Sequence, residues 1–282
     1  MKKNNLLILT ALKAEAIPII HYYGLKKKEY SKYISVYSTE NINLLITGVG
    51  KTNVQKTIRN FCNIHNLEQK LFTVNIGSAG GNPDHCKIGD IFLINKITDE
   101  NNRTSFYPDV LFKHGMEEFS LTTVKNPAIN GHRKYDSLVD MEASAIWNLF
   151  KSRIPVHRML FIKVISDFMN IQNKKFEDFE KLVVEILNNQ LKHITNLVSI
   201  LQNVDLNDIP TFSKNEIQFL KKVSTNLRLT ETQKIKLDEL AENRKYIHDD
   251  IFKRLNPFSS INSNDKHHRN EIFKKICSVL ST

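Results

Sequence analysis

The stretch LFTVNIGSAGG, residues 71–81, decides how this chain folds. Residues 71–76 form an apolar run of strand length, and residues 77–81 are all small. A buried strand that ends in small residues leaves its next backbone N–H groups uncovered, so a flat polar ligand such as a sugar can approach them closely. Gly-rich turns also follow strands in α/β folds generally, so a plain tight turn is the alternative interpretation.

Short apolar runs alternate with stretches of helical periodicity up to about residue 202. The pattern predicts strands at 6–10, 33–38, 43–47, 71–76, 90–97 and 158–165, and helices at 13–22, 52–64, 141–150 and 176–201. This alternation is typical of an α/β domain. Polar motifs fall where strands end or helices begin, which is the edge at which α/β sheets bind ligands.

The chain of 282 residues is long enough for one large domain and an appendage. Residues 1–202 form the predicted α/β domain, and residues 203–213 form a linker in which Asn, Asp and Pro210 break the helical pattern. Residues 214–282 are predicted to be a helical extension.

Two capping-box pairs support the helical extension. Ser213 is followed by Glu216, and Thr230 by Gln233, each ahead of apolar residues at helical spacing. The extension is expected to be a helical lid over the site or an interaction module for another protein.

The chain carries a formal charge of +10, which would concentrate anionic ligands near it. No block of five consecutive Lys or Arg marks a basic arm, so we do not expect the chain to bind nucleic acid. Cys62, Cys86 and Cys277 are scattered, which indicates free thiols in a reducing compartment. The histidine pair 267–268 is isolated, and we expect no metal site.

Nothing near the N-terminus looks like a signal peptide, and no apolar stretch approaches the roughly 20 residues that span a bilayer. We therefore expect a cytoplasmic protein without a membrane segment.

Five further motifs accompany the glycine segment: ALKAE at 11–15, GVGK at 48–51, IGDI at 88–91, VDMEA at 139–143 and ISD at 165–167. In this order and spacing, the series resembles the methylthioadenosine/S-adenosylhomocysteine nucleosidases and the wider nucleoside phosphorylase family. The resemblance covers about residues 5–202. It implies a three-layer α/β sandwich with a central mixed sheet, hydrolysis of a purine N-glycosidic bond, no cofactor and a homodimer.

Cleavage of that bond requires protonation of the leaving base, a positioned water and stabilisation of a ribose with oxocarbenium character. Asp167 ends a buried strand, and the resemblance implies that it is the general acid toward N7 of the purine. Ser166 would orient it. The alternative is a solvated Asp that caps the next turn.

The resemblance assigns two more carboxylates. Glu15, in the first turn of a helix, would orient water toward C1′ of the ribose, although Leu12 replaces the family's Met. Glu142 would accept hydrogen bonds from the 2′ and 3′ hydroxyls, with Met141 packed under the sugar. The alternatives are a Glu favoured by the helix dipole at position 15, and a core Met with a helix-start acid at positions 141 and 142.

Ser78, Ala79 and Gly80 would form the ribose-side floor of this site. The resemblance also favours hydrolysis over phosphorolysis, because hexameric phosphorylases carry an Arg where this chain has Asn75 and this chain has no Arg before Arg59. Phosphorolysis remains an alternative, as does a non-catalytic nucleoside sensor or scaffold.

The segment GVGKT at 48–52 ends like a phosphate-binding P-loop. That motif requires a Gly where the chain has Leu45, inside a strand, so the P-loop interpretation fails on spacing. The segment is expected to turn a strand into a helix.

The chain departs from the family between residues 97 and 139, which is much shorter here. Arg103 and its neighbours lie where a base-binding segment is expected, and Phe106 is the candidate for stacking on the base, with Tyr107 and Phe112 beside it. Packing residues are an equally good interpretation of these aromatic side chains.

Overall fold

The computed structural model describes residues 4–31, 34–64, 71–110, 112–129, 131–170, 175–204, 212–246, 250–263 and 265–281. The chain divides into two compact units, Met1–Val204 and Asp205–Thr282, which are described separately. Most of the predicted linker at 203–213, including Pro210, lies outside the described residues. None of the described helices combines the length and the apolar character that a bilayer span requires.

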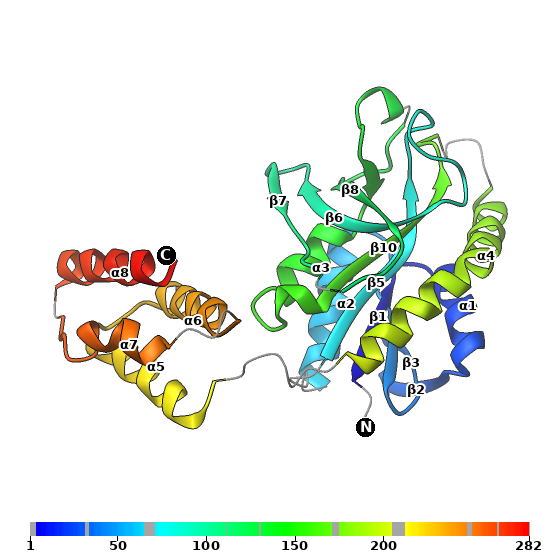
Figure 1. The fold of residues 1–282 in the computed structure, drawn as a ribbon. Coiled ribbons are helices and arrows are strands. Elements are labelled where there is room, and N and C mark those ends of the chain that lie inside the picture. The colour runs from blue at the N-terminus through cyan, green and yellow to red at the C-terminus, as the bar shows by residue number, and fades with distance from the viewer. Residues whose placement is uncertain are drawn as a thin grey trace. The chain divides into compact units, whose positions relative to one another are not determined.

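The described part of the first unit is built on one ten-stranded sheet. Its strands are β1 (Asn5–Thr10), β2 (Lys26–Ser31), β3 (Ile34–Ser38), β4 (Ile42–Ile46), β5 (Leu71–Gly80), β6 (Ile91–Asp99), β7 (Thr104–Phe106), β8 (Glu117–Thr123), β9 (Leu138–Asp140) and β10 (Met159–Asp167). Its longer helices are α1 (Lys13–Tyr23), α2 (Lys51–Ile64), α3 (Ala143–Phe150) and α4 (Phe176–Asn203). Contacts pair α1 with α4 and α2 with α3, and the two pairs cover opposite sides of the sheet (Figure 1).

The sheet closes on itself. Strand β5 pairs in parallel with β1 and β10, and β10 also pairs with β6 in the antiparallel direction. From β6 the ladder runs through β8 and β9 back to β5, where Gly80 pairs with Val139. The mixed α/β prediction is therefore confirmed, but the plain three-layer sandwich is corrected. The strands β5, β10, β6, β8 and β9 therefore pair in a closed ring, so the sheet curls into a barrel there.

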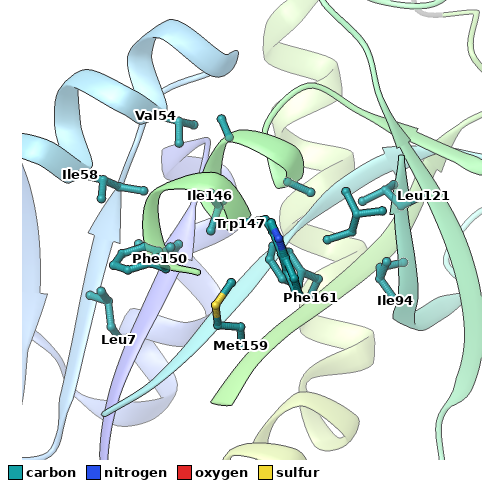
Figure 2. Close-up of a cluster of buried hydrophobic side chains, with 14 of the residues drawn as sticks. Leu7, Val54, Ile58, Ile94, Leu121, Ile146, Trp147, Phe150, Met159 and Phe161 are labelled. Atoms are coloured by element: carbon teal, nitrogen blue, oxygen red, sulfur yellow. The ribbon is translucent and has the colours of Figure 1, made fainter. Parts of the chain in front are cut away.

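The core lies between the curled sheet and the pair α2 and α3. Val54 and Ile58 of α2 share one buried cluster with Ile146 and Phe150 of α3, and the ring centroid of Trp147 lies 6.3 Å from that of Phe161 of β10 (Figure 2). All nine residues of β10 are buried, as in a strand covered on both faces. Burial on this scale anchors the strand that ends at Asp167.

Strand β5 continues to Gly80, through most of the glycine segment whose alternative interpretation is a tight turn. The ladder with β10 extends from Lys163 beside Gly77 to Asp167 beside Gly80. A Cβ added at Gly81 would lie 2.3 Å from Sγ of Cys86. The small residues are therefore required because side chains from other segments pack directly against this end of the strand.

The second unit is helical, as predicted, with α5 (Lys214–Asn226), α6 (Glu231–Tyr246), α7 (Ile251–Leu255), the 3₁₀ turn η5 (Asn256–Phe258) and α8 (Lys266–Ser281). Both predicted capping boxes are present. The backbone N–H of Ser213 donates to Glu216 at 2.6 Å, and that of Thr230 donates to Gln233 at 3.1 Å. The helices enclose a core of their own, including Leu237.

Candidate active site

A cavity of about 310 Å³ lies where β5, β9 and β10 end. This volume is in the range of sites that hold small ligands. Parallel strands bring their carboxyl ends to one edge, so segments far apart in the sequence meet there. All but one of the predicted site residues line the cavity: Glu15, Ser78, Ala79, Gly80, Met141, Glu142, Ser166 and Asp167.

Both carboxylate oxygens of Glu15 accept hydrogen bonds. Its Oε2 accepts from the backbone N–H groups of Ala11 at 2.8 Å and Leu12 at 3.0 Å. Its Oε1 accepts from both the N–H and the hydroxyl of Ser78, each at 2.8 Å. The sequence suggests that the N–H groups after β5 are free to bind a sugar. The N–H of Ser78 instead donates to Glu15 and fixes its carboxylate. A Cβ at Gly77 would lie 3.1 Å from Oε1, so the small residue leaves room for this carboxylate.

Glu142 is held by the loop that resembles a P-loop. Its Oε1 accepts a hydrogen bond of 2.7 Å from the N–H of Gly50. Gly50 has a φ of +85°, in the left-handed region that glycine adopts without strain. The sequence predicts only a turn at this position, and the structure adds that the turn anchors Glu142.

A buried ion pair that the sequence motifs do not predict lies beside Glu142. Nζ of Lys163 is 2.9 Å from Oδ2 of Asp140, and both side chains are almost completely buried. Asp140 also accepts from the hydroxyl of Thr123 at 2.7 Å and from the N–H of Ala143 at 2.9 Å. Asp140 lines the cavity. Its place two residues before Glu142, in the VDMEA motif, is the feature of the sequence that could have pointed to it.

Burial raises the pKa of Glu142 to about 7, and the neighbouring charge of Asp140 adds to the effect while Lys163 opposes it. Burial also acts to lower the pKa of Lys163, but attraction to Asp140 and Glu142 outweighs it and the net pKa is raised. Lys163 is therefore a cation at neutral pH, and the floor of the cavity carries more negative than positive charge.

Asp167 is fixed at the end of β10 and is 3% exposed. Its Oδ2 accepts from the hydroxyl of Ser166 at 2.8 Å, and its Oδ1 accepts from the N–H of Met169 at 2.7 Å. The bond to Met169 does cap the next turn, as the alternative interpretation has it. Asp167 is nevertheless buried at the cavity rather than solvated.

Phe106 is the predicted site residue that does not line the cavity. It belongs to β7, pairs with Ile97 of β6, and stacks on Trp147 with ring centroids 5.5 Å apart. Tyr107 is 60% exposed, and the ring of Phe112 meets that of His114 edge-on. Phe106 therefore packs against Trp147 and does not lie where it could stack on a base in the cavity.

Other residues form the apolar part of the wall. Phe176 and Phe179 come from the first turn of α4, and Val124, Pro127 and Ala128 from the segment after β8. The two Phe residues are three positions apart and so share one face of the helix, which was a signal in the sequence. The segment after β8 carries no motif that could have been found.

Charge and polarity restrict what the cavity can bind. Among the described residues that line it, none is Lys, Arg or His. Asn75 is 2% exposed, lies outside the lining, and donates its amide N–H to the carbonyl of Leu9 at 3.2 Å. No group of three or more His, Cys, Asp or Glu suited to a metal ion occurs within the described ranges.

The fold and the cavity define an α/β unit with a partly closed sheet and a site rich in carboxylates. No protein-family model matches the sequence, and no curated protein matches it. Solved structures do match the fold, and several methylthioadenosine/S-adenosylhomocysteine nucleosidases are among them.

A nucleosidase of Chlamydia trachomatis bound to methylthioadenosine is 20% identical, with a TM-score of 0.55 over 70% of this chain and 99% of that one. The 5′-methylthioadenosine nucleosidase of Arabidopsis thaliana is 18% identical, with a TM-score of 0.57 over 74% of this chain and 100% of that one. The enzyme of Helicobacter pylori, solved with butyl-thio-DADMe-Immucillin-A, is 14% identical, with a TM-score of 0.57 over 70% of this chain and 98% of that one. The first unit thus has the nucleosidase fold, which confirms the resemblance at the level of fold.

Proposed function

We propose that the first unit hydrolyses the N-glycosidic bond of a purine nucleoside of the methylthioadenosine or S-adenosylhomocysteine type. The observation that carries this proposal is the meeting of Glu15, Glu142 and Asp167 around one cavity. The fold shared with solved nucleosidases supports the same reaction.

In the proposed reaction, Asp167 donates a proton to N7 of the departing base. General acids act within hydrogen-bond reach of the atom they protonate, and Asp167 is the carboxyl group that Ser166 orients at the end of β10. Glu15 directs a water molecule at C1′ and accepts its proton as the new C1′–O bond replaces the bond to the base. Its two oxygens are fixed by Ala11, Leu12 and Ser78, so the carboxylate has one orientation without any ligand.

Glu142 accepts hydrogen bonds from the 2′ and 3′ hydroxyls of the ribose, and Met141 packs beneath the ring. As positive charge develops on the ribose, bonds to an ionised Glu142 strengthen, which stabilises the transition state more than the ground state. The excess of carboxylates around Lys163 favours the same cationic ribose.

Water is favoured over phosphate as the second reactant. A phosphate ion needs cationic or bidentate donors, and none of the described lining residues supplies them. The carboxylates of Glu15 and Glu142 would instead repel phosphate and nucleotides. The apolar wall formed by Phe176 and Phe179 suits a methylthio group at the 5′ position better than the charged homocysteine of S-adenosylhomocysteine.

The test is a panel of purine nucleosides and nucleotides incubated with the full chain, with and without phosphate, and resolved by chromatography. We expect free base and free sugar from 5′-thio nucleosides in the absence of phosphate, with no gain when phosphate is added. A sugar phosphate product would overturn hydrolysis, and absence of cleavage of every compound would overturn the enzymatic proposal. A homodimer, a cytoplasmic location and a protein partner for the helical unit stay predictions.

A further inference from the structure

Met169 has an unusual backbone conformation for a residue with a side chain. Its φ is +58°, in the left-handed region that such residues adopt only at an energetic cost. Among the described non-glycine residues, Arg103 and Arg228 share this feature, and neither lines the cavity. Met169 does line it, two positions after Asp167.

The N–H of Met169 donates a hydrogen bond of 2.7 Å to Oδ1 of Asp167. The other oxygen, Oδ2, is engaged by the hydroxyl of Ser166 at 2.8 Å. With one donor on each oxygen, the carboxyl group cannot rotate without losing a hydrogen bond. A carboxyl group that must protonate one atom of a bound base benefits from this single orientation.

The side chain of Met169 explains how the conformation is kept. It is 2% exposed and packs against Val124 and Val139. A Cβ at Gly80 would lie 2.8 Å from its Cγ, and a Cβ at Gly131 would lie 2.7 Å from its Sδ. The side chain therefore fills the space between the end of β5 and the 3₁₀ turn η1 (Gly131–Arg133), and both glycines leave room for it.

We propose that Met169 is a positioning residue for Asp167: its side chain, held between Gly80 and Gly131, keeps its backbone N–H on Oδ1 and so aims the carboxyl group at the base. This inference rests on the proposed function, because it assigns Asp167 a catalytic role. It also gives the segment after β8 a purpose, since that segment supplies Gly131 and thereby part of the support for Asp167.

The test compares Met169→Gly with the wild-type chain. Glycine adopts the same φ without strain and keeps the N–H, but it removes the packing that holds the N–H in place. We expect kcat to fall roughly tenfold or more, with KM changed less than about threefold. If Met169 only supplied apolar contact to the ligand, KM would rise and kcat would stay the same, which would overturn the proposal.

Arg228→Gly is the matched control, because it relieves the same backbone strain in the exposed turn after α5. Its kcat and KM should equal the wild-type values. Met169→Leu, which keeps an apolar side chain of similar volume, should retain at least about a third of kcat. A Leu variant as slow as the Gly variant would contradict a role for packing.

Gly131→Ala approaches the same side chain from η1 and serves if Met169→Gly folds poorly. Its new Cβ would lie 2.7 Å from Sδ and 3.2 Å from Cβ of Met169. We expect it to displace the side chain and to lower kcat severalfold, with KM changed less than about threefold. A wild-type kcat in a folded Gly131→Ala protein would overturn the proposed contact.

A crystal structure of Met169→Gly separates this inference from the proposed function, because it needs no turnover. We expect the distance from the residue-169 N–H to Oδ1 of Asp167 to exceed about 3.5 Å. An unchanged bond would overturn the inference even if the enzyme is active. A broken bond in a protein that cleaves no nucleoside would support the positioning contact and refute only the reaction.

Discussion

At the residue scale, Glu142 combines burial with a hydrogen bond that suits its ionised form. Burial raises its pKa to about 7, whereas the N–H of Gly50 stabilises the carboxylate. Only the ionised form accepts hydrogen bonds from two ribose hydroxyls with both oxygens. We therefore predict that kcat/KM falls as the pH drops below about 7, measured with a 5′-thio nucleoside over pH 5–9. A flat profile down to pH 5 would contradict the role of Glu142.

The same shift predicts how stability depends on pH. The folded-state pKa of Glu142 is raised from 4.5 to about 7, so the folded state binds more protons than the unfolded state between these values. The resulting stabilisation is complete below pH 4.5 and is lost as the pH rises through about 7. Glu142→Gln should remove this component from the difference in melting temperature between pH 5 and pH 8. An identical pH dependence in both proteins would show that Glu142 titrates normally.

Lys163 opposes the upward shift of the Glu142 pKa. In Lys163→Met, the acid limb of the kcat/KM profile should therefore move to higher pH by roughly one unit or more. Lys163→Arg, which keeps the charge, should lie close to the wild type. Lys51→Met is the matched control, because it breaks a second ion pair. That pair, with Asp99 at 2.8 Å, is partly buried and lies outside the cavity lining. Its profile should keep the wild-type midpoint, and an unmoved midpoint in Lys163→Met would contradict the electrostatic account.

At the scale of elements, the end of β5 depends on side-chain size. Gly81 has Sγ of Cys86 in the space that a Cβ would occupy, and Ile165 is also near. We predict that Gly81→Ala lowers the free energy of unfolding by about 1–3 kcal/mol in a urea titration. Combining it with Cys86→Ala should recover part of the loss. Equal stability of Gly81→Ala and wild type would mean that this end of the strand is loosely packed.

The sequence predicted six strands of the sheet, β1, β3, β4, β5, β6 and β10, but neither β2, β7, β8 and β9 nor the closure of the sheet. Apolar runs and motif positions located the strands that end at Gly80 and Asp167, because these are local patterns. The pairing of β10 with β6 joins distant segments and has no local signal. Phe106 was misplaced for the same reason: which side of β7 meets Trp147 depends on how the sheet curls.

The carboxylates Glu15, Glu142 and Asp167 were identified from the motifs that resemble the nucleosidases, and each of them also ends a strand or lies at the start of a helix. The groups that fix them are mostly backbone N–H donors, such as those of Gly50 and Met169, and composition does not reveal these. Lys163 lies within an apolar run of the sequence, which gives no sign of an ion pair. Its pairing with Asp140 follows only from the placement of β9 and β10 in the same barrel.

At the scale of the whole molecule, the two units differ in what they contain. Every described residue that lines the carboxylate cavity belongs to Met1–Val204. The helical unit has its own core and its own capped helices. We predict that a truncated chain of residues 1–204 keeps at least half of the wild-type kcat/KM, measured by base release. A loss of more than about tenfold in a folded, truncated protein would show that the helical unit takes part in catalysis.

The central claim is that Asp167 protonates a purine leaving group in a hydrolytic site. The most direct measurement is the time course of adenine release from methylthioadenosine, without phosphate, by the wild-type chain and by Asp167→Asn. Asn cannot donate an acidic proton but has nearly the same shape, so we predict steady release by the wild type and a rate at least about a hundredfold lower in the variant. Equal rates in the two proteins, or no release by the wild type, would contradict the account.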